Sequence, residues 1–243
     1  MKTVEAAKPV RMDGTFNFRD LGGYPAETGK TVSGRFFRSD ALDRLSDADL
    51  SWMKEQDITC VIDLRAKAET MQKPDRLQEG FVYHAVSMSD KLFDEDGKRI
   101  VPDCLSDLYR SILETQGKEF AQVMHIMAER KGRPVVFHCA VGKDRTGLTA
   151  MFLLSLAGVP EEVIAVDYEP SAQNMKPYFD VMRAQLLKLN VAVPEVMFGS
   201  PKEEMLRTLA FIRKKWGSPR EYLRQCGVLE EELIELRALL LKP

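Results

Sequence analysis

The stretch His138-Cys-Ala-Val-Gly-Lys-Asp-Arg-Thr-Gly147 lies between a run of strand-forming residues and a run of helix-forming residues. Before it, residues 134–137 are β-branched and aromatic apart from the leading proline, which is typical of a buried strand. After it, residues 148–157 are apolar enough to form a core helix, which Gly158 and Pro160 are expected to end. The sequence therefore predicts a strand-to-helix turn at this stretch.

A turn of this kind is suited to binding a tetrahedral oxyanion. Its unpaired backbone N–H groups and the positive end of the helix dipole point toward the same concave side. Gly142 and Gly147 allow backbone conformations that other residues reach only with strain. We therefore expect one continuous segment to bind phosphate, namely Ala140, Val141, Gly142, Lys143, Asp144 and Arg145.

Cys139 and Arg145 are the two residues of the turn that are best suited to chemistry. A free thiol is only slightly ionised at neutral pH, but the loop amides, the helix dipole and the Arg145 guanidinium all favour a thiolate. We therefore expect Cys139 to be an ionised nucleophile, with Arg145 holding two phosphoryl oxygens through its planar fork. Thr146 either directs its hydroxyl at the sulfur or caps the helix N-terminus.

The run HCAVGKDRTG resembles the cysteine-x5-arginine signature of the protein tyrosine phosphatase superfamily, and most closely the bacterial and fungal family whose loop reads HCxxGKDRTG. The segments NFRDLGGY (17–24), RFFRSDAL (35–42) and VIDLR (61–65) occur in that family in the same order. The resemblance covers roughly residues 12–170, and the C-terminal helices more loosely. It implies a metal-free, two-step hydrolysis of phosphomonoesters through a phosphocysteine.

Expelling a phenolate or alkoxide requires a proton donor, for which the chain offers several aspartates. Asp144 lies inside the loop, where the resembled family places its acid, and the nearby phosphate charge favours its protonated form. Asp63 is the alternative, because it follows a predicted strand whose carboxyl end would face the same crevice. It can instead pair with Arg65 or Arg38. Five further aspartates lie in a polar stretch, and most of them are expected to be solvated. They are Asp90, Asp94, Asp96, Asp103 and Asp107.

Two other residues of the loop have both a functional and a structural interpretation. His138 orients the loop by hydrogen bonds, or is simply a satisfied structural histidine. Lys143 adds positive charge that would admit phosphoinositide headgroups, or is simply solvated. Besides His138 the chain has only His84 and His125, too few and too scattered for a metal cluster, so the sequence predicts no metal and no cofactor.

Two other loop types are disfavoured by spacing. A nucleotide-binding Walker loop needs Ser or Thr after its lysine and a glycine further upstream, whereas Asp144 follows Lys143 and Phe137 occupies the glycine position. A sulfurtransferase also uses a cysteine at such a turn, but the spacing to Arg145 and the Thr-Gly that follows suit phosphate better. Sulfur transfer remains a minor alternative.

The composition indicates one globular domain over residues 1–243. The formal net charge of −2 excludes a global field that would attract nucleic acid or an anionic membrane. Residues 1–13 lack the apolar core of a signal peptide, and the apolar run 150–157 is too short to span a bilayer. The cysteines do not suggest a disulfide scaffold, so we expect a cytoplasmic protein. They are Cys60, Cys104, Cys139 and Cys226.

The order of elements predicts an α/β fold, protein tyrosine phosphatase-like, with a mostly parallel central sheet flanked by helices on both faces. Expected elements are a helix beginning at Ser46, strands over 58–64 and 81–86, and two helices whose apolar faces are marked by residues from Tyr109 to Met127. Residues 161–202, which prolines interrupt, are expected either to form a helical cap that selects substrates or to pack as ordinary helices. Residues 203–243 are expected to be scaffold helices, one of them starting at Ser218.

These observations predict a protein tyrosine phosphatase that hydrolyses phosphotyrosine in proteins. The depth of its pocket would decide whether phosphoserine and phosphothreonine are also accepted, because a shallow pocket admits shorter phosphate esters. The alternatives are a phosphoinositide phosphatase and a catalytically silent module that binds phosphorylated partners.

Overall fold

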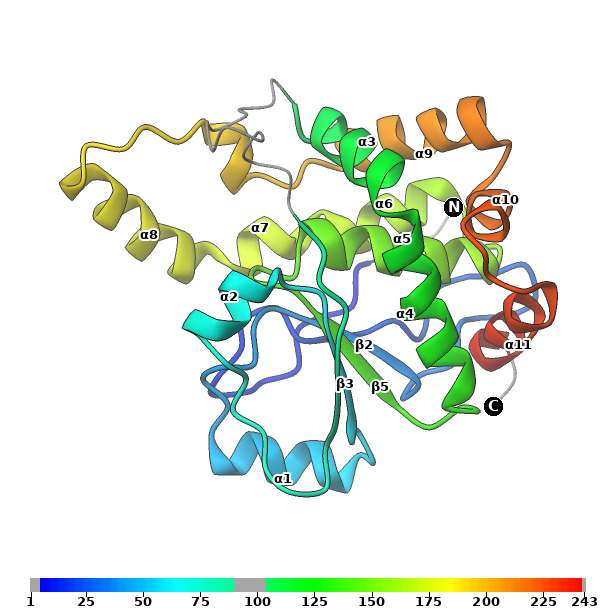
Figure 1. Ribbon diagram of the computed structural model, residues 1–243, viewed down its shortest axis with the longest axis horizontal. Coiled ribbons are helices and arrows are strands. Elements are labelled where there is room, and N and C mark those ends of the chain that lie inside the picture. The colour runs from blue at the N-terminus through cyan, green and yellow to red at the C-terminus, as the bar shows by residue number, and fades with distance from the viewer. Residues whose placement is uncertain (1–4, 90–103, 242–243) are drawn as a thin grey trace.

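The five strands of the computed structural model form one sheet, and the structure describes residues 5–89 and 104–241 (Figure 1). The strand order is β1-β2-β5-β3-β4. Only β1 and β2 are antiparallel, whereas the other neighbours are parallel, which confirms the predicted mostly parallel sheet. The strands are β1 (Arg19–Asp20), β2 (Phe36–Ser39), β3 (Cys60–Asp63), β4 (Val82–Ala85) and β5 (Val135–His138).

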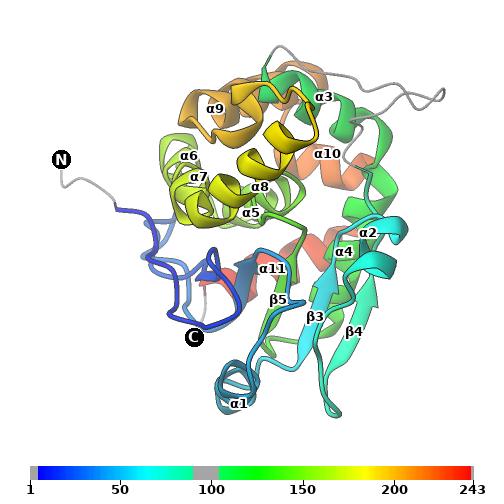
Figure 2. The ribbon, with the colours of Figure 1, turned by 90° about the vertical axis from the view of Figure 1, so that its left-hand side faces the viewer.

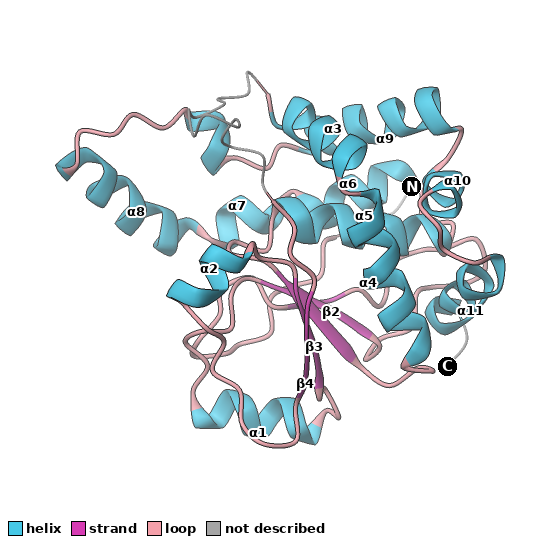
Figure 3. Ribbon diagram, in the orientation of Figure 1, coloured by secondary structure: helices cyan, strands magenta, loops and turns pink. Residues whose placement is uncertain are grey.

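Helices surround this sheet, as Figure 3 shows. Up to the central strand β5 they are α1 (Asp47–Glu55), α2 (Lys67–Gln72), α3 (Leu105–Thr115) and α4 (Gly117–Glu129). After β5 they are α5 (Asp144–Leu156), α6 (Glu161–Tyr168), α7 (Pro170–Asn174), α8 (Lys176–Lys188), the 3-10 helix η1 (Glu195–Phe198), α9 (Lys202–Trp216), α10 (Pro219–Gln225) and α11 (Glu230–Leu241).

Alternating side chains of the strands build a core on each face of the sheet. On β2, Phe36 belongs to the larger cluster, together with residues of α3 to α6 and α9 to α11. The next residue, Phe37, packs on the opposite face with Leu50 and Met53 of α1. Successive residues of a strand point to opposite faces of the sheet. A strand with consecutive apolar residues therefore contributes to the hydrophobic core on both faces.

The predicted helix starts are confirmed, whereas the strands are shorter than expected. Ser46 and Asp49 form a capping box at α1, and the Ser218 hydroxyl accepts a hydrogen bond from the Glu221 amide at α10. The strand expected over 58–64 spans Cys60–Asp63, because only these residues pair with both neighbouring strands.

Residues 161–202, for which both a cap and ordinary packing helices are expected, divide into two parts. Helix α6 packs in the main core, through Val163 and Ile164 among others. Helix α8 and η1 instead form a small separate cluster around Phe179 and Phe198, and this cluster rests on Val141 of the 138–147 turn. Figure 1 shows α8 projecting from the body of the molecule, and Figure 2 places it in front of α5. None of the helices in the described part of the chain is long and apolar enough to cross a membrane.

Candidate active site

The predicted turn joins β5 to α5, whose first helical residue is Asp144. Gly142 has a φ of 70°, and a Cβ built on it would lie 2.4 Å from the carbonyl oxygen of Ser39. Both its conformation and its close contact therefore require glycine. The turn and the start of α5 lie at the carboxyl end of β5, and a helix N-terminus at such a position favours binding of an anion.

Side chains from the N-terminal part of the chain hold the outside of this turn. The Arg38 guanidinium donates to the carbonyl oxygen of Gly142 at 2.7 Å, and the Asn17 amide donates to Val141 and Gly142 at 3.1 and 3.2 Å. Arg38 is itself paired with the buried carboxylate of Asp167. Because these donors bind loop carbonyls on the outside, they fix the backbone that presents its amides to the pocket.

Cys139 and Arg145 line the same cavity, which has a volume of about 370 Å³. The sequence expectation that these two residues face one pocket is thus met. The floor is polar, whereas α8 and the segment after it supply an apolar roof. The lining residues are Glu69, Leu108, Cys139, Ala140, Val141, Lys143, Asp144, Arg145, Tyr178, Phe179, Met182, Leu186, Val193, Met197 and Phe198.

Arg145 is held by a carboxylate that the sequence analysis did not single out. Glu69 of α2 accepts hydrogen bonds from Nη1 and Nη2 of Arg145, at 2.6 and 3.0 Å, and the carbonyl oxygen of Met88 accepts a further bond at 3.0 Å. Burial favours protonated Glu69, but the bonds and charge of Arg145 outweigh it and lower the pKa of Glu69. The guanidinium is therefore fixed in the pocket by an ionised partner.

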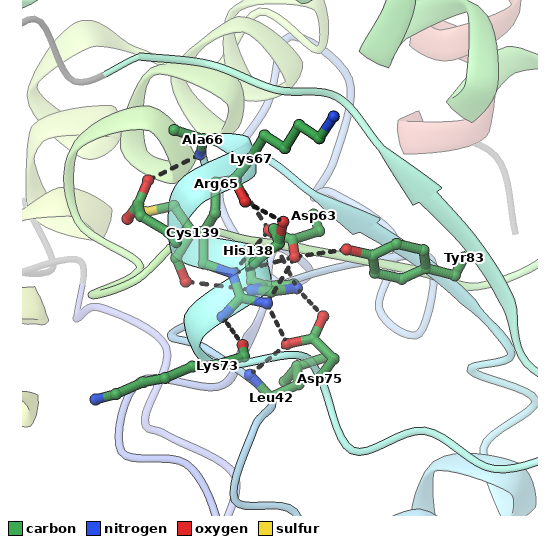
Figure 4. Close-up of polar contacts among 12 residues, drawn as sticks. Leu42, Asp63, Arg65, Ala66, Lys67, Lys73, Asp75, Tyr83, His138 and Cys139 are labelled. Atoms are coloured by element: carbon green, nitrogen blue, oxygen red, sulfur yellow. Dashed lines mark hydrogen bonds and ion pairs between the residues drawn. The ribbon is translucent and has the colours of Figure 1, made fainter.

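His138 belongs to a buried charged cluster behind the nucleophile (Figure 4). Its Nε2 lies 2.9 Å from Oδ2 of Asp75, and its Nδ1 lies 3.2 Å from the carbonyl oxygen of Cys139. Burial alone would lower the pKa of His138, but the Asp75 carboxylate, with a smaller effect from Asp63, raises it to about 9. A protonated imidazole therefore lies directly behind the reactive cysteine.

Asp63 is bound on all sides by groups of the same cluster. Arg65 donates to it through Nε and Nη2, and the Tyr83 hydroxyl donates at 2.8 Å. Burial would raise the pKa of Asp63, but His138 and Arg65 lower it. The structural interpretation of Asp63, in which its carboxylate pairs with Arg65, is therefore confirmed.

Asp63, Asp75 and His138 offer ligand atoms within 4.8 Å of one another, as in some metal sites. Arg65 donates from one Nη2 to both carboxylates, at 2.6 and 2.7 Å. Because a guanidinium already compensates both negative charges, this donor set fits an ion-pair network better than a metal ion.

Asp144, the predicted acid, lies in the pocket wall with its side chain 20% exposed. The Tyr109 hydroxyl of α3 donates to its Oδ1 at 2.6 Å. Tyr109 in turn lies 2.6 Å from the Tyr168 hydroxyl, and burial together with Asp144 raises the pKa of Tyr109 well above its usual value. This tyrosine pair therefore stays neutral and orients the Asp144 carboxyl group.

Lys143 is not a solvated lysine, and that expectation is wrong. Its side chain is 1% exposed, and its Nζ donates to the carbonyl oxygens of Met197 and Gly199 at 2.7 and 2.9 Å. The ammonium also lies 3.6 Å from Oδ1 of Asp144. Burial is tolerated because each of these oxygens compensates the charge. Lys143 thus fastens the pocket roof to the turn.

Thr146 is not the N-terminal cap of α5, because the cap residue is Lys143 and Thr146 lies within the first helical turn. Its Oγ1 is buried and has no hydrogen-bond partner among the described residues. The capping interpretation is therefore wrong. An unpartnered hydroxyl at this position suits the other interpretation, in which Thr146 directs its hydroxyl at the cysteine sulfur.

Sequence reasoning missed the partners that approach the turn from other elements. Glu69, Asp75 and Tyr109 precede the residues that they contact by 76, 63 and 35 positions, so no local pattern connects them. Of the aspartates expected to be solvated, Asp107 pairs with Arg110 on α3. The others lie outside the described residues.

Several known proteins are similar to this chain. A family model described as "Tyrosine phosphatase family" matches residues 10–242. The chain is 31% identical to a tyrosine-protein phosphatase of Nostoc commune, covering 83% of this chain and 72% of that one. It is 27% identical to the triple specificity protein phosphatase PtpB of Mycobacterium tuberculosis, covering 95% and 98%. The crystal structure of TpbA from P. aeruginosa aligns with a TM-score of 0.46 at 14% identity, covering 93% and 99%.

Proposed function

Because this chain belongs to the tyrosine phosphatase family, we propose that it hydrolyses phosphotyrosine in proteins through a phosphocysteine at Cys139. The observation that carries the proposal is the shared pocket of Cys139 and Arg145 at the N-terminus of α5. A thiol, a guanidinium and a turn of backbone amides are the groups that a phosphoryl transfer to sulfur requires.

In the first step the Cys139 sulfur attacks phosphorus, and the bond from phosphorus to the phenolic oxygen breaks. Arg145 and the loop amides hold the equatorial oxygens and stabilise the charge that develops on them. Asp144 donates its proton to the leaving oxygen, so that neutral tyrosine departs. Tyr109, which bonds the same carboxyl group at 2.6 Å, positions this acid.

In the second step water attacks the phosphocysteine, and the sulfur leaves as a thiolate. Asp144, now ionised, accepts the proton of the water, and inorganic phosphate is the product. The Thr146 hydroxyl stabilises the departing sulfur by a hydrogen bond. The protonated His138 behind the cysteine stabilises the same negative charge through the backbone of the loop.

The apolar roof supports an aromatic substrate. Phe179, Met182 and Phe198 lie across the pocket from the charged floor, so an aryl ring above the phosphate would bury apolar surface against them. An inositol ring would instead place its hydroxyl groups there at a cost. Lys143 already uses its charge within the protein and is not free to bind a further headgroup phosphate. We therefore rank phosphotyrosine above phosphoinositides.

A broader specificity is the second candidate, because the relative from M. tuberculosis carries the name triple specificity protein phosphatase. Rates of hydrolysis of three substrate classes distinguish a phosphotyrosine-specific enzyme from one of broader specificity. We expect phosphotyrosine peptides to be hydrolysed faster than phosphoserine peptides or inositol phospholipids. Cys139→Ser should abolish all three activities. A wild-type protein without measurable hydrolysis of any of the three would leave only the silent binding module, whereas a Cys139→Ser variant as active as the wild-type protein would exclude Cys139 as the nucleophile.

The location of the protein is part of the same proposal. All four cysteines are free thiols, and Cys139 must stay reduced to attack phosphorus. These features suit a cytoplasmic enzyme, because the cytoplasm is kept reducing. A reporter fused to the chain and detected outside the cytoplasm would contradict this assignment.

A further inference from the structure

A second, smaller cavity adjoins the catalytic pocket on the side of α2. Its volume is about 240 Å³, and it shares Glu69, Ala140 and Tyr178 with the catalytic pocket. Its other lining residues come from the segment after β2, from the segment after β3, and from the C-terminal end of α2. They are Ala41, Asp43, Arg44, Arg65, Gln72 and Lys73. A substrate bound to Cys139 can therefore extend into this cavity.

Some of the charges around the second cavity are already compensated. Arg65 uses its Nε and Nη2 on Asp63 and Asp75, and its Nη1 on the carbonyl oxygen of Lys73. Glu69 is paired with Arg145. Neither Arg65 nor Glu69 therefore contributes an unbalanced charge to a ligand in this cavity.

Arg44 is held at the edge of the cavity with its charge accessible. Its guanidinium lies 5.1 Å from the centre of the Phe16 ring and 3.8 Å from Oδ2 of Asp40. Even so, its side chain is 46% exposed. A cation held over an aromatic ring does not use its N–H donors for that contact. These donors remain available to an anion.

Lys73 supplies the second cation. It is exposed, and in the described part of the chain its ammonium has no hydrogen bond or ion pair. Asp43 is the one carboxylate of the lining that has no charged partner among those residues. Asp40, the ion-pair partner of Arg44, is buried and accepts hydrogen bonds from the amides of Phe16 and Asn17. The charges that a ligand in this cavity can reach are therefore two cations and one carboxylate, next to a pocket built for a phosphoryl group.

We propose that this cavity, the anion subsite, binds a side-chain carboxylate carried by the same peptide as the phosphotyrosine. The inference rests on the proposed function and adds a preference for acidic sequence around the tyrosine. Arg44 and Lys73 are the residues that recognise the acidic group. The subsite acts on binding, because neither residue lines the pocket of Cys139.

The test compares three phosphotyrosine peptides that differ only in flanking residues, which are glutamate, glutamine or lysine on both sides. Arg44→Gln and Lys73→Gln should each lower kcat/KM for the acidic peptide about threefold, and the double variant about tenfold. The loss should appear in KM and should shrink at high salt. Lys67→Gln, an exposed lysine at the start of the same helix α2, is the matched control and should change nothing.

Hydrolysis of para-nitrophenyl phosphate separates this inference from the proposed function. This substrate has no flanking residues, so the double variant should hydrolyse it at the wild-type rate. Lys73→Glu should shift the preference from the glutamate peptide toward the lysine peptide. The inference is overturned if the double variant treats all three peptides as the wild-type protein does, or loses activity on all substrates equally. A wild-type protein inactive on para-nitrophenyl phosphate would refute the proposed function instead.

Discussion

The carboxylate of Glu69 bonds both terminal nitrogens of Arg145, at 2.6 and 3.0 Å, across the mouth of the catalytic pocket. This pair keeps the guanidinium in a fixed plane before substrate arrives. Because an arginine side chain has many rotamers, the carboxylate removes freedom that substrate binding would otherwise have to remove.

Glu69→Gln should therefore lower kcat/KM about 10- to 100-fold, because hydrogen bonds between charged groups contribute about 1.5–3 kcal/mol. The substitution keeps the shape of the side chain and one acceptor oxygen. Steady-state hydrolysis of para-nitrophenyl phosphate measures the effect. Glu55→Gln, at an exposed carboxylate at the end of α1, is the control. An unchanged kcat/KM in Glu69→Gln would show that Arg145 needs no such partner.

Asp144→Asn should act on the leaving group. A general acid contributes about 10²- to 10⁴-fold, and the contribution grows as the leaving group becomes more basic. We expect kcat for phosphotyrosine to fall about 100-fold, and kcat for aryl esters with acidic phenols to fall much less. A series of aryl phosphates measures this dependence.

Asp63→Asn provides the comparison for this experiment. Asp63 is bonded by Arg65 and Tyr83, so its loss should lower the free energy of unfolding and leave the leaving-group dependence as in the wild-type protein. If Asp63→Asn instead steepens that dependence and Asp144→Asn does not, the two roles are reversed.

The His138–Asp75 pair predicts a pH-dependent stability. The pKa of His138 is raised from 6.5 to about 9 in the folded protein. Its stabilising contribution is therefore fully present below pH 6.5 and is lost as the pH rises through 9. Asp75→Asn removes the carboxylate, so the difference in unfolding free energy between the wild-type protein and this variant should shrink over that range.

Denaturant unfolding at several pH values measures this difference, and a titration of the His138 ring by NMR checks its origin. A constant difference between pH 6 and 10 would contradict the assignment. Some difference should persist at high pH, because Asp75 also pairs with Arg65 at 2.7 Å.

Lys143→Met should loosen the roof. The substitution keeps an unbranched chain but leaves the carbonyl oxygens of Met197 and Gly199 without their donor, at a cost of about 1–3 kcal/mol. Hydrogen exchange of residues 195–199 should become faster, and KM for a phosphotyrosine peptide should rise. Lys202→Met, at an exposed lysine of α9, is the control. Unchanged exchange would show that other contacts hold the roof.

The sequence predicted the parts of this site that are local in the chain. The run from His138 to Gly147 contains its own strand end, glycines and helix start, so the strand-to-helix turn and the shared pocket of Cys139 and Arg145 could be predicted from it. Lys143 was misjudged because its surroundings are not local. Its acceptors follow it by 54 and 56 positions, and only the packing of α8 and η1 brings them to it. Burial of a polar side chain is decided by such distant partners.

The proposed hydrolysis requires that Cys139 forms a covalent bond to phosphorus. The most direct measurement mixes the enzyme with a phosphotyrosine peptide, stops the reaction with acid within milliseconds and locates the phosphate by peptide mass spectrometry. We predict a phosphate on Cys139 that appears faster than free phosphate and is trapped for longer in Asp144→Asn with a good leaving group. Phosphate release with no label on Cys139 at any time, or undiminished release by Cys139→Ser, would contradict the claim.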